Sequence, residues 1–162
     1  MRRRVSMLVA SLVAILGVLF AVSRINISAL PEPGNAESYV ATRVKRMLVR
    51  GNSRHIILPA TSNVQASIVE GEKLFGVECA ACHGMEGTNP TDAGRWMYPR
   101  APNLASSGVQ QYSDAELFWI VKNGIRLTGM PAYGPVETDA NIGHLVCYVR
   151  SLRQTKRTTL SK

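Results

Sequence analysis

The stretch Cys79-Ala80-Ala81-Cys82-His83 decides how this 162-residue chain is interpreted. Two cysteines three positions apart can each form a thioether bond to one of the two vinyl groups of a single haem. The histidine that follows is then held against the iron from one side. The pattern therefore indicates covalent attachment of one haem c.

Two other uses of such a cysteine pair fit the chain less well. A structural zinc site needs two further ligands at suitable spacing, and the remaining candidates, Cys147, His55 and His144, are not paired. A redox disulfide of the thioredoxin kind is expected inside a βαβ pattern, which does not surround this motif. Cys147 stands in an apolar helical stretch, where a small core residue is the expected role.

A methionine is the expected second iron ligand. Met130 stands in a glycine- and proline-rich loop that is neither a helix nor a strand. A thioether opposite a histidine is the ligand pair of electron-transfer cytochromes, where it raises the reduction potential. Met85 is too close to His83 in sequence to reach the far side of the ring. If Met97 were the ligand, more of the chain that wraps around the haem would have to follow it, so Met130 is preferred.

From about Ser67 to Leu152 the chain resembles the class I cytochromes c. The run Gly71-Glu72-Lys73-Leu74-Phe75 before the motif is similar to the first helix of that family. The resemblance implies an all-α fold, with three to four helices around one covalently bound haem. It also implies that Gly71 permits a close crossing with the last helix, where Phe75 meets Leu145 and Tyr148.

The run Arg100-Ala101-Pro102-Asn103-Leu104 resembles the loop that orients the ligand histidine in this family. The resemblance implies that the carbonyl oxygen of Pro102 accepts the imidazole proton of His83, which tunes the basicity of the ligand. One departure is Ala101, which replaces a glycine that is common in the family.

The segment from Gly84 to Ala101 is expected to be an irregular loop passing under the haem edge. It contains four candidates to bind the haem propionates, or to lie at the surface instead, since an arginine or an aromatic donor there would offset two carboxylates: Arg95, Trp96, Tyr98 and Arg100.

Two later helices have clear signals. Ser113 and Glu116 fit a capping box for a helix that ends near Asn123, with Leu117, Ile120 and Val121 as its buried stripe. Thr138 or Asp139 can cap a final helix from Ala140 to about Arg153. Its predicted inward residues are Ile142, Leu145, Val146, Val149 and Leu152.

The chain divides into four predicted regions: an N-terminal membrane segment 1–23, a basic linker 24–66, a haem domain 67–153 and a basic tail 154–162. Three arginines precede an uncharged run from Val5 to Ser23, which at about 1.5 Å per residue approaches the ~30 Å hydrocarbon core. The arginines favour a cytoplasmic N-terminus with the remainder outside. A cleaved signal peptide is the alternative, although its apolar run would be unusually long.

A helix is expected from Ala36 to about Arg50, capped by Asn35 and ended by Gly51-Asn52. Tyr39, Val40, Val44, Met47 and Leu48 are predicted to share one face, with basic residues around much of the rest. Such a helix can lie on a membrane surface, dock a partner, or pack on its own haem domain.

The formal net charge of +8 is concentrated in the first part of the chain. Residues 1–66 carry nine Lys and Arg against two Asp and Glu, whereas residues 67–162 carry ten against nine. The charge thus favours an anionic membrane surface or an acidic partner over nucleic acid.

The expected function is electron transfer without catalysis. With His83 and Met130 both bound, the iron has no open position for a small-molecule substrate. The chain is therefore interpreted as a membrane-tethered electron carrier that meets redox partners on the periplasmic side. A dedicated subunit of a membrane oxidoreductase is the alternative, and a haem sensor or peroxidase-like enzyme is a third possibility.

Overall fold

The computed structural model describes residues 2–24, 27–59 and 64–159, and within these ranges it contains helices and no strand. The chain forms two compact units, Met1–Pro31 and Glu32–Lys162. The helices are α1 (Arg2–Ser23), α2 (Asn35–Ser53), α3 (Val64–Glu78), α4 (Ala80–His83), α5 (Asp92–Trp96), α6 (Ser107–Gln110), α7 (Asp114–Asn123) and α8 (Asp139–Thr159). The predicted all-α class is confirmed.

The first unit is dominated by α1, whose apolar side chains are exposed along its whole length. Residues Arg3–Ser23 are long and apolar enough, in length and composition, to cross a membrane. No other helix in the described part of the chain meets this criterion.

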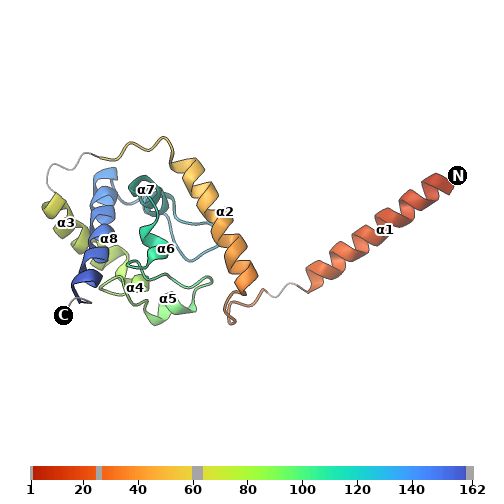
Figure 1. Ribbon diagram of the computed structural model, residues 1–162, viewed down its shortest axis with the longest axis horizontal. Helices are drawn as coiled ribbons and strands as arrows, with labels where there is room; N and C mark the ends of the chain where they lie inside the picture. The colour runs from red at the N-terminus through yellow and green to blue at the C-terminus, as the bar shows by residue number, and fades with distance from the viewer. Residues whose placement is uncertain (1, 25–26, 60–63, 160–162) are drawn as a thin grey trace. The chain divides into compact units, whose positions relative to one another are not determined.

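The second unit is organised by the crossing of α3 and α8, which lie together on one side of it (Figure 1). A Cβ atom added to Gly71 of α3 would lie 2.1 Å from the carbonyl oxygen of His144 and 2.9 Å from Cβ of Tyr148. Only a residue without a side chain allows the two backbones to come this close. The predicted role of Gly71 is therefore confirmed.

A core cluster lies beside this crossing. The rings of Phe75 and Tyr148 are 5.0 Å apart and tilted by 49°, which is a favourable aromatic geometry. Leu145 and Leu152 of α8 complete the contact and are almost fully buried. Burial of each such side chain contributes about 1.5–3 kcal/mol, so this cluster fixes how α3 and α8 meet.

The two predicted capping signals are present. The Ser113 hydroxyl accepts from the Glu116 backbone N–H at 3.2 Å, and the Glu116 carboxylate accepts from the Ser113 N–H at 2.6 Å. At the start of α8, the Thr138 hydroxyl accepts from the backbone N–H of Asn141 at 3.2 Å. All five residues predicted to face inward on α8 are buried: Ile142, Leu145, Val146, Val149 and Leu152.

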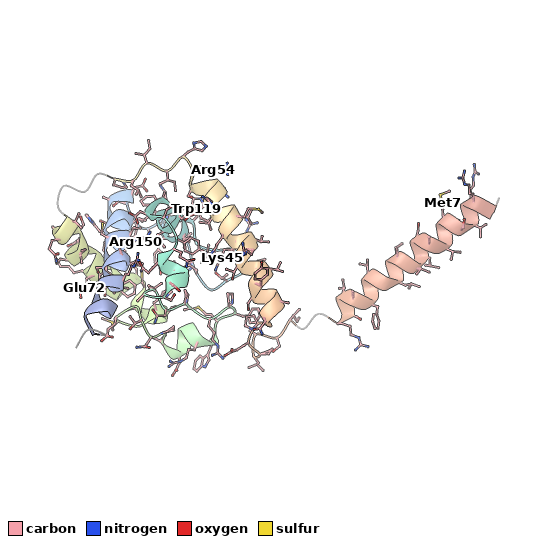
Figure 2. The ribbon with its side chains drawn as sticks, in the orientation of Figure 1. Met7, Lys45, Arg54, Glu72, Trp119 and Arg150 are labelled. Atoms are coloured by element: carbon pink, nitrogen blue, oxygen red, sulfur yellow. The ribbon has the colours of Figure 1, made fainter. Side chains whose placement is uncertain are left out.

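A polar network joins α6, α7 and α8 beneath the core. The buried Gln110 amide donates to the carbonyl oxygens of Leu104 (2.8 Å) and Val149 (2.9 Å). Arg150, labelled in Figure 2, bonds Asp114 across the gap between α8 and α7 at 2.5 Å. Because Gln110 is buried and Arg150 is half-buried, each of these two side chains needs its partners.

The segment after the cysteine motif is more regular than expected. Instead of an irregular loop from Gly84 to Ala101, it contains α5, which begins where the Thr91 hydroxyl accepts from the Gly94 N–H at 3.3 Å. A Thr-Asp pair is a typical helix start, but α5 is so short that glycine and proline around it outweigh this signal in the sequence.

Helix α2 belongs to the second unit and lies along its side opposite α3 and α8, next to α7 (Figure 1). Its boundaries differ from the prediction, because Gly34 rather than Asn35 is the N-cap and the helix continues through Gly51 to Ser53. Val49 and Ser53 are buried there, so tertiary packing overrides the helix-ending tendency of the glycine.

The arginine at position 46 anchors α2 to the unit. Its guanidinium donates to the Gly108 carbonyl oxygen and the Gln111 side-chain oxygen, both at 3.0 Å, and lies 5.3 Å from the Tyr112 ring centre. The residues predicted to form one apolar face all remain exposed: Tyr39, Val40, Val44, Met47 and Leu48.

Replacing Gly71 with alanine is expected to lower the free energy of unfolding by about 1–3 kcal/mol, because the new methyl group must separate α3 from α8. The measurement is denaturant unfolding of the haem-loaded protein. The matched control is Gly76→Ala on the same helix, where the nearest atom to a Cβ is 3.8 Å away. That change should be neutral or stabilising, and equal losses for both variants would contradict a close crossing at Gly71.

Candidate haem site

The cysteine motif lies at the turn that follows α3. Cys79 is the N-cap of α4, and Cys82 and His83 stand in that single helical turn. Both thiols are free and half-buried, while His83 is only 8% exposed. The motif thus forms a compact set of two sulfurs and one imidazole at the end of a rigid helix.

The imidazole of His83 is oriented by a backbone carbonyl. Its Nδ1 lies 3.2 Å from the oxygen of Pro102. Burial lowers the pKa of His83 below its usual range, although the Pro102 hydrogen bond acts in the opposite direction. A neutral imidazole facing a carbonyl must donate from Nδ1, which leaves the Nε2 lone pair available for a metal.

The neighbourhood of Cys79 is also shielded from water. Burial, followed by the nearby charge of Glu78, raises the pKa of the Cys79 thiol to about 12, so the free cysteine is a neutral thiol. The Tyr133 hydroxyl donates to the carbonyl oxygen of Glu78 at 2.5 Å, and burial raises its pKa to about 12 as well. Tyr133 therefore connects the end of α3 with the chain that follows α7.

The turn of α4 is supported from below by α5 and the residues before it. The Thr91 hydroxyl donates to the Ala81 carbonyl oxygen at 2.6 Å, and the Thr91 N–H donates to the Cys82 carbonyl oxygen at 3.1 Å. A Cβ on Gly94 would lie 2.1 Å from the same Cys82 oxygen. Backbone contacts therefore hold the second cysteine in place.

A glycine returns the chain from the motif to the core. Gly87 has φ +66°, which favours glycine, and a Cβ there would lie 2.8 Å from Leu152. The Gly87 carbonyl oxygen accepts from the Leu104 N–H at 2.8 Å. Because Leu104 is two residues after Pro102, this contact brings the orienting carbonyl to His83.

The loop that carries Met130 closes back onto the end of α7. Gly124 has φ +66°, and a Cβ there would lie 2.7 Å from the Met130 oxygen. Near the end of α7, the carbonyl oxygen of Val121 accepts from the Tyr133 N–H at 3.1 Å, and that of Lys122 accepts from the Gly134 N–H at 2.9 Å. The loop is therefore fixed by main-chain bonds at both ends.

Met130 is half-buried, and its N–H donates to the Thr128 hydroxyl at 3.1 Å. A second methionine reaches the same loop, because a Cβ on Gly129 would lie 2.3 Å from Sδ of Met97. Met97 thus packs against the residue immediately before Met130. No pattern in the sequence predicts this contact.

Of the four candidate propionate partners, three have other partners and one is largely exposed. Arg95 forms an ion pair with Asp92 at 2.8 Å. Tyr98 donates to the Glu37 carboxylate at 2.5 Å, and Arg100 forms an ion pair with Glu32 at 2.8 Å. Trp96 is 77% exposed. The role of these residues at a haem stays a prediction, and the partners of Tyr98 and Arg100 belong to α2 and the residues before it.

The donor set fits a covalently attached haem. Two free thiols stand three positions apart, and the imidazole that follows keeps one nitrogen free of described partners. Among the described residues, no group of three or more His, Cys, Asp or Glu side chains forms an alternative metal site. Thr91, Gly94 and Gly124 support this site, and of these only Gly124, which follows the predicted helix end at Asn123, could be located from the sequence.

Helices crossing at a glycine, with a thiol–imidazole turn at the end of the first, define a c-type cytochrome domain. The chain belongs to the family described as cytochrome C oxidase, cbb3-type, subunit III, whose model matches residues 66–149. The comparison with curated proteins gave no match.

Solved structures share the fold. One of them is the Kuenenia stuttgartiensis reducing HAO-like protein complex Kustc0457/Kustc0458, at 21% sequence identity and a TM-score of 0.51. The likeness covers 60% of this chain and 47% of that chain, so this protein spans about half the length of its structural neighbour. At this identity the likeness supports the fold alone.

Replacing Thr91 with valine should lower the free energy of unfolding by about 1–2 kcal/mol, since the Ala81 carbonyl oxygen and the Gly94 N–H lose a partner. Urea unfolding of the haem-loaded protein measures the change. Thr88→Val is the matched control, because its hydroxyl has only a 3.4 Å contact with Asn89. If the two variants unfold alike, the hydroxyl of Thr91 does not support the motif.

Proposed function

We propose that this protein is a membrane-tethered monohaem cytochrome that carries single electrons between redox partners outside the cytoplasmic membrane. The observation that carries the proposal is the contact between His83 Nδ1 and the Pro102 oxygen, directly beside two free thiols. A neutral, oriented imidazole with a free nitrogen is what an iron ligand requires. The family supports an electron carrier.

Four residues would hold the cofactor: Cys79 and Cys82 through thioether bonds, His83 through Nε2, and Met130 through its sulfur. Bound haem would supply a one-electron iron couple. The chain orients the imidazole through Pro102 and restrains the methionine loop by hydrogen bonds at Val121 and Lys122. With His83 and Met130 both bound to the iron, no open position would remain for substrate chemistry.

The tether is proposed from α1. Its length and apolar composition suit a single membrane crossing, and the arginines that precede the apolar run favour a cytoplasmic N-terminus. The haem domain would then lie on the periplasmic side, where c-type haem attachment takes place in this family. A tether also raises the local concentration of the carrier near membrane-bound partners.

Replacing Met130 with alanine should remove the weak red charge-transfer band of the oxidised protein and lower the reduction potential, because a thioether ligand raises it. Visible spectroscopy and a redox titration measure both. Met97→Ala is the matched control, since Met97 contacts the same loop but is not the proposed ligand. The control should keep the band.

A band that survives Met130→Ala would contradict the proposed ligand. A high-spin iron in the intact protein, with rapid carbon monoxide binding near neutral pH, would contradict the electron-carrier function and favour a sensor or enzyme.

Replacing Leu12 with arginine should weaken membrane retention, because an arginine at the centre of a membrane helix costs about 3 kcal/mol. The measurement is the fraction of protein that resists alkaline carbonate extraction from membranes. Leu12→Phe, an apolar control, should be retained like the original chain. Complete extraction of the unaltered protein would contradict the proposed anchor.

A permanent subunit of a membrane oxidoreductase is the second candidate, favoured by the description of the matching family as an oxidase subunit. Gentle detergent solubilisation of native membranes, followed by size separation and haem staining, distinguishes the two. A carrier migrates at the size of the single chain, whereas a subunit migrates in a stoichiometric complex with other chains.

A further inference from the structure

Helix α2 presents an apolar stripe to the outside of the unit that it packs on. Val40, Val44, Met47 and Leu48 recur at helical spacing and have exposed fractions of 59%, 45%, 66% and 54%. The opposite side of the same helix contacts the unit through Arg46, Val49 and Ser53 and buries the last two. The helix is therefore amphipathic with its apolar stripe outward.

The packing of the other side holds this orientation in place. Turning the stripe inward would break both Arg46 hydrogen bonds and remove Val49 from its buried position. Lys45 also projects from α2 toward the rest of the unit (Figure 2). Burial, together with the charge of Arg46, lowers the pKa of Lys45. These contacts therefore keep the apolar stripe on the solvent-exposed side of α2.

The charges beside the stripe have one sign. Arg43, Arg50 and Arg54 are exposed, and Arg43 lies over the ring of Tyr39 at 5.2 Å. The acidic residues nearby are already engaged, because Glu37 accepts from Tyr98 and Glu32 pairs with Arg100. Exposed arginines beside an apolar stripe are typical of helices that lie in the plane of an anionic bilayer.

The chain before α2 keeps this surface near a membrane. If α1 crosses the bilayer as proposed above, only residues 24–34 separate its last residue, Ser23, from the start of α2. A segment of that length reaches at most about 40 Å when fully extended. The stripe therefore stays within reach of the headgroups.

We propose that the outward face of α2, formed by Val40, Val44, Met47, Leu48 and the arginines beside them, binds the surface of an anionic lipid bilayer. The apolar side chains enter the boundary between headgroups and acyl chains, and the arginines extend to the lipid phosphates. Binding fixes one side of the haem domain toward the membrane and leaves the other sides for redox partners. The inference rests on the proposed anchoring by α1.

The test measures the accessibility of a single thiol at the centre of the stripe. The haem-loaded full chain carries Cys147→Ala, so that no other free thiol remains, together with Met47→Cys. The matched control carries Val77→Cys on α3, which is 78% exposed. Both proteins are mixed with vesicles of phosphatidylcholine, with or without phosphatidylglycerol, and the rate of reaction with a membrane-impermeant maleimide is recorded.

The thiol at position 47 should react about tenfold more slowly with phosphatidylglycerol present, and high salt should restore the rate because it screens the arginines. The thiol at position 77 should react equally fast throughout. Adding Arg43→Gln, Arg50→Gln and Arg54→Gln should restore the rate at position 47 without salt.

Equal rates at positions 47 and 77 in anionic vesicles would overturn the inference. The inference would also be overturned if the thiol at position 47 were protected equally in neutral and anionic vesicles and more strongly at higher protein density, because a second copy of the chain would then cover the stripe. Carbonate extraction of the same samples reports on α1 separately. If the anchor fails there, the thiol at position 47 is protected only if α2 binds lipid by itself.

Discussion

The close crossing of α3 and α8 at Gly71 is the constraint on which the rest of the second unit depends. Because the backbones meet without an intervening side chain, the direction of α3 is set to within the tolerance of a van der Waals contact. The cysteine motif begins one residue after α3 ends, so the crossing also sets where the thiols stand. Gly87 then returns the chain to the same core, and its bond to Leu104 brings the Pro102 oxygen to the imidazole.

The candidate site is held mainly by backbone atoms rather than by contacts between side chains. The imidazole is oriented by a carbonyl oxygen, the motif turn rests on the Thr91 hydroxyl and N–H, and the methionine loop is closed by hydrogen bonds to the last carbonyls of α7. These bonds would restrict motion of the proposed ligands in either redox state. A small change in geometry between two oxidation states suits electron transfer better than substrate binding.

The sequence was sufficient to predict those features for which a local pattern and a core contact indicate the same structure. The capping box at Ser113, the inward stripe of α8 and the crossing at Gly71 were all predictable, since each depends on a spacing along one helix or on a resemblance of several residues in order. The short helix α5, the continuation of α2 through Gly51 and the contact of Met97 with Gly129 were not predictable. The helix α5 is too short for its local cap to stand out among glycines and prolines, whereas the other two features depend on partners far away in sequence, which neither propensity nor periodicity specifies. The outward stripe of α2 also depends on distant partners, because its orientation is set by the contacts of Arg46, Val49 and Ser53 with the unit and not by the residues of the stripe.

The attachment of α2 has a practical consequence for where this protein can be shortened. Tyr98 and Arg100, which bond Glu37 and Glu32, stand in the same loop as Pro102. A fragment that starts at the first residue of the cytochrome resemblance would lack α2 and these partners. The surface that Val49 covers would then be exposed to water, and the loop that orients the histidine would lose its contacts with Glu37 and Glu32. A fragment that starts just before Glu32 would preserve them. The natural boundary for truncation thus lies well upstream of the residues that a family match covers.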